Sequence, residues 1–372
     1  MSPPLLFSPL SLGRVALPNR IMVSPMCQYS AIDGNTTDWH LTHLGALAIS
    51  GAGLLCVEAT AVSPEGRITH GCTGLYNDDN EKAWQRTLDG LRAIAPVKLA
   101  IQLGHAGRKA SSQRPWEGGA LILPADGGWQ PLAPSALAHK SDEAAPTAMT
   151  EADIAKLIID FAAAATRAKR LGFDVIELHC AHGYLLHEFL SPLANQRQDN
   201  YGGTLENRMR LPLQIFQAVR EAAGPDIAVG VRLSGTDWVE GGWDIAQSIV
   251  LSKALQALGA DFIDMSSGGV SPLQKITLGP GYQVPLAAQV RQAVSIPVIT
   301  VGLITEPAQA EQILQQGDAD VVALARAFLI NPRWPWRAAA ELGGTIWSPS
   351  QFYRCLPAAH PAIFGQISTA QR

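Results

Sequence analysis

Eight short apolar runs recur along the chain, and they constrain its fold more than any other feature. The first is RIMVSP at residues 20–25, and the last is DVVALA at residues 320–325. Each run is nearly continuous in apolar residues, which is the pattern of a parallel strand that is covered on both faces. The expected strands are 20–25, 53–59, 98–104, 173–179, 227–233, 261–267, 297–302 and 320–325.

Amphipathic stretches occupy the intervals between these runs. We expect helices over 150–172, 205–224, 244–259 and 306–317, each followed or ended by a glycine that suits a helix stop. A strand–helix unit that occurs eight times predicts a (β/α)8 TIM barrel, in which the first and last strands pair. An open, doubly wound sheet is the alternative that the same alternation allows.

Two segments lie outside this repeat, and the whole chain, 1–372, is expected to form a single domain. Residues 105–149 form a long connection rich in Gly, Pro and Ser, which predicts a lid or capping loop. Trp116 in this loop either caps a pocket or anchors local packing. Residues 343–372 form a C-terminal arm without sustained periodicity, which either docks elsewhere or frays.

The composition excludes several classes of protein. Charged residues make up 16% of the chain, the net charge is −4, and no Lys/Arg-rich run is present, which argues against a nucleic-acid partner. No run approaches the length of a membrane span, and the N-terminus lacks the pattern of a signal peptide, so we expect a cytoplasmic protein with no membrane partner. The five cysteines are scattered without a C-x-x-C pair, and Cys56 and Cys180 are expected to be small core residues.

Polar side chains gather at the ends of the expected strands, where barrels of this kind place their active sites. Cys27 and Tyr29 follow the first strand, and the fourth ends in HCAHGY. The candidate residues at the strand ends are Cys27, Tyr29, Gln102, His179, His182, Tyr184, Arg232, Gly302 and Arg326. A site rich in donors and poor in carboxylates suits an anionic ligand, or a reaction that develops negative charge on oxygen.

Other interpretations of these residues are open at this point. His179 and His182 have a spacing that could ligate a metal, but a third ligand is not evident at the neighbouring strand ends, and we expect no metal. Arg232, inside an apolar strand, could belong to a buried ion pair with Glu58 or Glu177. A metal-dependent barrel hydrolase and a non-catalytic binding barrel are therefore the alternative functions.

Several longer motifs resemble the Old Yellow Enzyme family of FMN-dependent ene-reductases. They include SPMCQYSA, VEATAVSPEGRIT, IQLGHAGRKA and HCAHGYLLHEFLSPLANQRQDNYGGTLENRMR. The resemblance is greatest to the bacterial branch of xenobiotic-reductase and thermophile-type members, which carry a cysteine in the first strand. It implies FMN as cofactor, NADPH or NADH as reductant, a small α,β-unsaturated carbonyl compound as substrate, and a homo-oligomer, either a dimer or a tetramer.

The resemblance also implies roles for individual residues. His179 and His182 would hydrogen-bond the substrate carbonyl and Tyr184 would donate a proton, while Tyr29 contacts the ligand. Arg354, in SQFYRC, would reach a neighbouring subunit's active site. The residues implied to bind the cofactor are Ser24, Pro25, Met26, Cys27, Ala59, Gln102, Arg232, Gly302, Ala325 and Arg326. Ala325 departs from the family pattern, which often has Gly there.

The chemistry of these residue types agrees with the implied roles. A fixed guanidinium at Arg232 stabilises the negative charge of a reduced flavin. Two imidazole N–H donors aimed at a carbonyl oxygen polarise a conjugated C=C bond. A tyrosine hydroxyl such as that of Tyr184 can then act as general acid.

Overall fold

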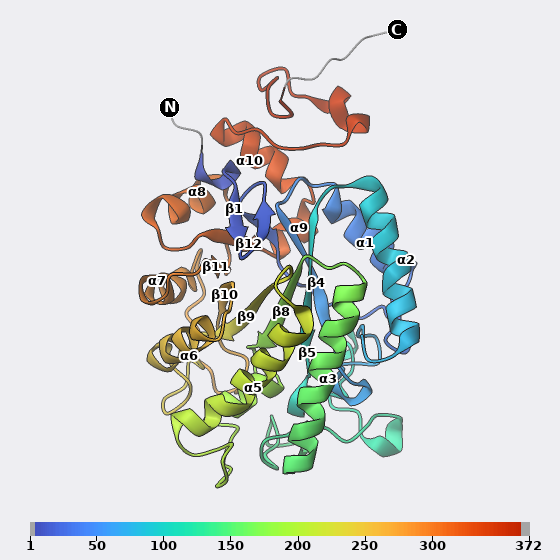
Figure 1. Cartoon of the computed structure of the whole chain (residues 1–372), viewed down its shortest axis with the longest axis vertical. Coiled ribbons are helices and arrows are strands. Elements are labelled where there is room, and N and C mark those ends of the chain that lie inside the picture. The colour runs from blue at the N-terminus through green and yellow to red at the C-terminus, as the bar shows by residue number, and fades with distance from the viewer. Residues whose placement is uncertain (1–3, 366–372) are drawn as a thin grey trace.

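Eight parallel strands close into one barrel in the computed structural model, which describes residues 4–365 (Figure 1). The last strand of the chain pairs with the first, so the predicted (β/α)8 fold is confirmed and the open-sheet alternative is wrong. Each strand lies within two residues of its predicted bounds. In order around the barrel they are β3 (Ile21–Val23), β4 (Leu54–Ala61), β5 (Lys98–Gly104), β8 (Val175–Cys180), β9 (Ala228–Ser234), β10 (Phe262–Ser266), β11 (Val298–Thr300) and β12 (Val321–Leu324).

Helices cover the outside of this barrel. The four predicted helices are α3 (Glu151–Arg170), α5 (Leu205–Ala223), α6 (Ile245–Ala257) and α8 (Pro307–Gln316). The glycines after them, Gly172, Gly224, Gly259 and Gly317, all have positive φ, as a helix stop requires. The other helices are α1 (Asp38–Ala48), α2 (Asp78–Ile94), α4 (Leu185–Leu190), α7 (Val284–Ala293), α9 (Arg326–Ile330) and α10 (Trp334–Leu342).

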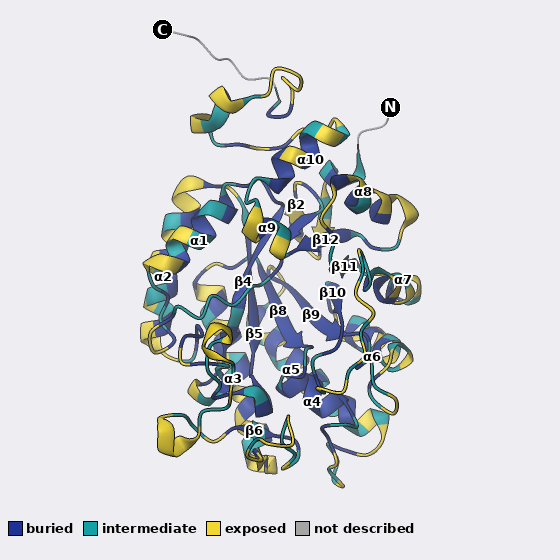
Figure 2. Ribbon diagram, turned by 180° about the vertical axis from the view of Figure 1, so that it is seen from behind, coloured by how far each residue is buried: buried dark blue, intermediate teal, exposed yellow. Residues whose placement is uncertain are grey.

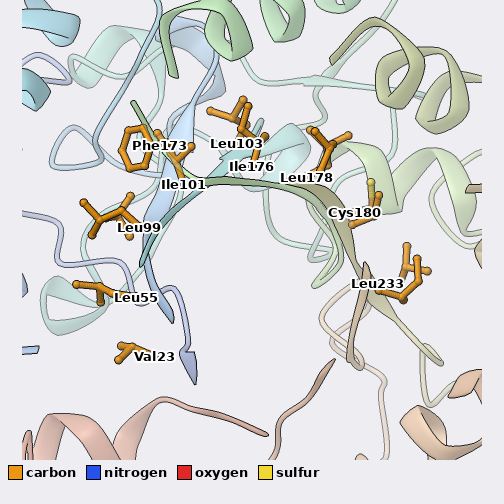
Figure 3. Packing of buried hydrophobic residues seen from close by; sticks show 14 of the residues in the cluster. Val23, Leu55, Leu99, Ile101, Leu103, Phe173, Ile176, Leu178, Cys180 and Leu233 are labelled. Atoms are coloured by element: carbon orange, nitrogen blue, oxygen red, sulfur yellow. The ribbon is translucent and has the colours of Figure 1, made fainter. Parts of the chain in front are cut away.

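Successive side chains along each strand point to opposite faces, which separates an apolar layer between strands and helices from one inside the barrel. Side chains such as Ile101, Leu178 and Leu233 point outward from the barrel wall toward the helices (Figure 3). Burying one such side chain stabilises the fold by about 1.5–3 kcal/mol. Figure 2 shows the consequence, because the barrel strands are almost entirely buried while exposed residues lie mainly on the outer helices and loops.

A β-hairpin that the sequence analysis did not anticipate closes one end of the barrel. Its strands, β1 (Leu10–Leu12) and β2 (Val15–Leu17), pair antiparallel through a turn at Gly13, which has a φ of 53°. The hairpin side chains pack against inward residues at the start of the barrel strands, including Leu54 and Phe262. The N-terminal end of the barrel is therefore filled and covered, which leaves the opposite end for a site.

The two segments outside the repeat are both folded in the described part of the chain. Residues 105–149 contain short 3-10 turns and a two-stranded ladder of β6 (Leu132–Ala133) and β7 (Thr147–Ala148). The arm after α10 docks on that helix, because Trp336 lies 5.3 Å from Phe352 and 5.0 Å from Phe364 between ring centroids. Figures 1 and 2 both show this arm beyond α10 at one pole of the molecule. Within the described residues, no helix has the length and apolarity needed to cross a membrane.

Candidate active site

The turn between β8 and α4 positions the residues that the sequence singled out. His179 is near the end of β8, His182 lies in the turn with a φ of 60°, and Tyr184 caps α4. The next residue, Gly183, has a φ of 70°, and a Cβ there would lie 2.2 Å from the carbonyl oxygen of Gly269. Glycine is therefore required for the β8–α4 turn to pack against the loop after β10.

The two histidines form one hydrogen-bonded chain, which we call the clamp. His179 Nδ1 accepts from the backbone N–H of Ala181 at 3.3 Å, so His179 carries its proton on Nε2, which lies 3.4 Å from His182 Nδ1. His182 Nε2 in turn lies 2.6 Å from Ser266 Oγ, whose hydroxyl donates to Gln283 Oε1 at 3.2 Å. This network assigns one proton to each imidazole and directs the His182 donor to Ser266 in the ligand-free chain.

Both imidazoles are neutral at neutral pH. Burial lowers the pKa of His179 well below its ordinary value, and the nearby cations Arg232 and Lys109 act in the same direction. The pKa of His182 is likewise lowered by burial, with His179 as the next cause. Neutral imidazoles suit hydrogen-bond donation to a carbonyl oxygen better than proton release, because each keeps a single N–H.

Tyr184 lies against the clamp and keeps its proton. Its ring meets that of His179 edge-on, with 4.9 Å between the centroids. Burial raises the pKa of the Tyr184 hydroxyl well above 10, so the group is a protonated acid at neutral pH.

Lys109 completes this arrangement, although the sequence analysis gave it no role. Its Nζ lies 4.8 Å from the centre of the Tyr184 ring and donates to the carbonyl oxygen of His182 at 2.9 Å. The available signal was its place in GHAGRKA, directly after the third strand.

Arg232 is paired, but not with the partners that the sequence suggested. Its Nε lies 3.1 Å from Oδ2 of Asp264, and both side chains are buried. Asp264 stands directly beside Arg232 in the register of β9 and β10. The prediction of Glu58 or Glu177 as partner was wrong: Glu58 faces His40 at 3.2 Å, and Glu177 accepts from Gln102 Nε2 at 2.8 Å. Strand periodicity places a side chain on a face, but the neighbouring strand supplies its partner.

Gln102, Glu177, Arg232 and Asp264 form a buried polar layer across the barrel interior. Burial raises the pKa of Glu177 to about 8, with the adjacent Asp264 as the second cause. Glu177 Oε2 has no hydrogen-bond partner within the described structure, whereas Arg232 Nε is held by the Asp264 carboxylate. Unpaired buried polar atoms cost free energy, so this layer is built to meet a further polar group.

A cavity of about 240 Å³ lies over this layer, and its residues fit the FMN that the resemblance implies. It runs from His182 and Arg232 to the ends of β11 and β12. Ser24 Oγ is buried without a partner beside it, and the φ of 123° at Gly302 keeps the backbone open there. Six of the residues predicted to bind the cofactor line this cavity: Ser24, Pro25, Arg232, Gly302, Ala325 and Arg326. They offer hydroxyl and guanidinium donors to an anionic, oxygen-rich ligand.

The other predicted residues lie around this cavity or away from it. Gln102 reaches the polar layer through Glu177, and Ala59 lines a small adjoining pocket with His179 and Tyr184. Met26 packs on the outer core. Burial raises the pKa of the Cys27 thiol well above 9, with Cys72 and Glu58 as further causes, so the thiol is neutral.

Two predicted ligand contacts have different surroundings. Tyr29 has a φ of 51°, and its ring meets that of Trp116 edge-on at 5.8 Å. Trp116 is 66% exposed, so it packs against a site residue at the surface. Arg354 is exposed on the arm and lines neither cavity of its own chain.

The histidines gather no metal-binding set. Within residues 4–365, no group of three or more His, Cys, Asp or Glu side chains is arranged to hold a metal ion. His187, which follows the clamp in α4, instead pairs with Asp237 at 2.8 Å, and both side chains are fully buried. A hydrolase that uses His179 and His182 as metal ligands would need a third ligand from outside the described residues.

Comparison with known proteins identifies close relatives of this chain. Residues 5–343 match the NADH:flavin oxidoreductase / NADH oxidase family. The chain is 45% identical to an NADH:flavin oxidoreductase of Gibberella zeae, over 93% of this chain and 87% of that one. It is 44% identical to an NADPH dehydrogenase of a Geobacillus species, over 94% and 98%. Among solved structures, morphinone reductase in complex with tetrahydroNAD superimposes with a TM-score of 0.76 at 30% identity, over 99% of both chains.

Proposed function

The chain belongs to the NADH:flavin oxidoreductase / NADH oxidase family, and from this premise we propose that it reduces C=C bonds activated by a neighbouring carbonyl group. It is a flavin-dependent NAD(P)H oxidoreductase of the Old Yellow Enzyme type, from the bacterial branch of that family. The observation that carries the proposal is a neutral imidazole pair beside a protonated tyrosine, at the edge of a cavity that fits FMN.

Different cavity residues would bind the phosphate and the ring system of the cofactor. Gly302 and Arg326 would hold the phosphate, because an exposed guanidinium and an open backbone suit an anion. Arg232, which lines the cavity and is fixed at Nε by Asp264, would donate its remaining N–H groups to the ring system. Bound FMN supplies the redox chemistry, taking reducing equivalents from NAD(P)H and passing them to the alkene.

The clamp would bind and polarise the substrate carbonyl. His179 Nε2 and His182 Nε2 are the two donors, so His179 would exchange His182 Nδ1, and His182 would exchange Ser266, for the substrate oxygen. The buried Ser266 then keeps its bond to Gln283, while His182 Nδ1 gives up its partner in the exchange. Removing one such donor typically slows a reaction about 10²- to 10³-fold.

Tyr184 would protonate the α-carbon of the substrate. The Tyr184 hydroxyl is protonated because burial raises its pKa, and its ring is fixed by His179 on one side and Lys109 on the other. The Lys109 ammonium also favours the phenolate that remains after proton transfer, because an adjacent cation stabilises the charged form. Lys109 thus assists Tyr184 through its positive charge.

The visible spectrum of the purified protein tests this function. We expect flavin bands that bleach with anaerobic NADPH and return on addition of cyclohexenone. Bands that bleach and then stay bleached with cyclohexenone and related enones would exclude ene-reduction while leaving the family assignment intact.

Tyr184→Phe tests the proton donor separately from the reductive step. We expect alkene reduction to slow by about 10²- to 10⁴-fold, while reduction of the flavin by NADPH changes little. Stopped-flow measurement of the two half-reactions separates them. Equal slowing of both would assign Tyr184 a structural role instead.

A further inference from the structure

A second cavity, of about 360 Å³, lies next to the clamp under the segment 105–149. Tyr29, Arg108, Lys109 and Lys140 are among the residues in its wall. Lys109 connects this cavity with the clamp, because it lines the cavity and its ammonium also contacts the Tyr184 ring. A molecule that reacts at the clamp can therefore extend into this space.

Arg108 is held in the cavity wall by three of its five N–H donors, which leaves two without a partner in the described part of the chain. Its Nη1 donates to the carbonyl oxygens of Leu137 and Ala138, each at 3.4 Å, and its Nη2 donates to that of Val270. The residue is only 7% exposed, and its Nε is buried without a hydrogen-bond partner in the described structure. The guanidinium is thus oriented by carbonyl groups, and its charge is left for another partner.

Three acidic groups lie near Arg108, and one of them, Asp237, is already held by His187 and Ser191. Glu143 is the carboxylate in the cavity wall, and it pairs with Lys140 at 2.9 Å. Glu188 lies behind Arg108 and accepts from its backbone N–H at 2.9 Å. Burial raises the pKa of Glu188 to about 8, so this carboxyl is largely neutral at pH 7. The cationic groups of Arg108 and Lys109 therefore face the cavity together.

We propose that this cavity is a subsite for a carboxylate or phosphate group of the molecule whose reacting end lies at the clamp, with Arg108 as the principal donor. The inference rests on the proposed function, because that function places the reacting end at His179 and His182. A buried, oriented guanidinium with a free N–H suits an oxyanion, and charge-assisted hydrogen bonds are about twice as strong as neutral ones. The anionic group can come from an acidic enone substrate or from the nicotinamide dinucleotide.

The first experiment compares an acid and its ester on the wild-type holoenzyme. The probe is an open-chain methyl enone that carries a carboxylate two carbons beyond the alkene, together with its methyl ester. If the substrate supplies the anion, we expect kcat/KM for the acid to exceed that for the ester by about 10-fold at low salt, and to approach it at high salt.

Arg108→Gln tests the donor, with Arg14→Gln as the matched control. Arg14 pairs with Asp226 at the surface of the hairpin end, and its side chain is 70% exposed, so this variant makes the same change in net charge away from the site. We expect Arg108→Gln to raise KM about 10-fold for the acid, or instead for NADPH if the dinucleotide supplies the anion. Values for cyclohexenone and the methyl ester should stay within about 2-fold of wild type. Arg14→Gln should change none of them.

A binding measurement without turnover distinguishes failure of the subsite from failure of the proposed function. The saturated keto acid, which cannot be reduced at a C=C bond, is titrated into the oxidised holoenzyme and followed by the flavin absorption. Tight binding that weakens in Arg108→Gln supports the subsite even if no enone is reduced.

The subsite is overturned if two results are obtained together. The acid and the ester react alike in the wild type, and Arg108→Gln, loaded with FMN, leaves the constants for the acid, NADPH and NADH unchanged. If Arg108→Gln does not fold, the wild-type measurements still decide the question. An anion subsite is excluded if the acid and the ester have equal constants and if the KM values for NADPH and NADH do not change with salt concentration.

Discussion

The two ends of the barrel interior are built from the same strands but differ in polarity. At the N-terminal end, the inward side chains are apolar, and the hairpin of β1 and β2 covers them. They include Leu54, Ala100, Val175, Ala228 and Phe262. Further along the same strands, the inward side chains are polar: Gln102 follows Ala100, Glu177 follows Val175, and Asp264 follows Phe262. On these strands the polarity therefore changes along the strand, whereas β11 and β12 continue inward with the apolar Val301 and Ala323.

This difference separates stability from function within one barrel. The apolar end stabilises the fold by burial alone, and its side chains need no partners. The polar end buries charged groups, which cost free energy unless each is paired, and it leaves Glu177 Oε2 without a partner in the described structure. The polar end is thus kept ready for a ligand at some cost in stability, and the apolar end supplies the stability that permits it.

Arg232→Met is expected to have the largest effect, because it damages stability and binding together. Removal of the guanidinium leaves the Asp264 carboxyl buried without its partner, which costs about 3–5 kcal/mol. Urea denaturation should show this loss, and FMN fluorescence should show weaker cofactor binding. The double variant Arg232→Met, Asp264→Leu should recover most of the stability but not the binding. Unfolding of the single variant at the wild-type urea concentration would contradict this account of the polar end.

Phe262→Ala tests the apolar end in the same way. The side chain is fully buried against the hairpin, so its removal should cost about 3–5 kcal/mol of stability. FMN affinity should stay within about 2-fold of wild type at a temperature where the variant is folded. A matched loss of FMN affinity would show that the two ends are not separable.

The pH dependence of stability reports on the polar layer. The pKa of Glu177 is raised to about 8, so the folded chain keeps a proton that the unfolded chain releases near pH 4.5. The stability that this carboxyl contributes is fully present below about pH 4.5 and is lost as the pH rises from there to about 8. Glu177→Gln, which stays neutral, should lose less stability between pH 6 and 9 than wild type, by about 2–3 kcal/mol. Parallel pH profiles from urea denaturation would argue against a protonated Glu177.

Substitution of one cysteine near each end of the barrel is expected to have the smallest effect on the cofactor and on stability. Cys27→Ala, near the site, should keep FMN bound and shift its midpoint potential by about 10–30 mV, the equivalent of a neutral hydrogen bond. Cys56→Ala, among the apolar residues of the other end, should leave the potential unchanged and cost about 1 kcal/mol of stability. Spectroelectrochemical titration measures both variants. An unchanged potential in Cys27→Ala would make this thiol a packing residue.

The elements were predictable because their signals are local. Apolar runs located all eight strands, and the glycines at 172, 224, 259 and 317 marked the ends of four helices. The hairpin of β1 and β2 escaped notice because three-residue strands carry too little periodicity to be recognised. The long loop and the arm could be delimited, but their 3-10 turns and the packing of Trp336 on Phe352 and Phe364 could not be foreseen.

The sequence could group the candidate site residues at the strand ends, but it could not predict their contacts. Local sequence placed His179, His182 and Tyr184 at the end of one strand, and the structure brings them into contact. It did not indicate that His182 would meet Ser266 from β10, or that Lys109 would lie over Tyr184. Each of these contacts joins residues from different strand–helix units.

The sequence by itself determined the order of the strands, the face on which each side chain lies, and the set of polar residues at one end of the barrel. These properties depend on the spacing of residues along the chain, which the strand and helix periods fix directly. The tertiary structure decided that Asp264 pairs with Arg232, that burial raises the pKa of Glu177, and that Arg108 lines a cavity. Those outcomes depend on the register between neighbouring strands and on the exclusion of water, which arise only when the barrel closes.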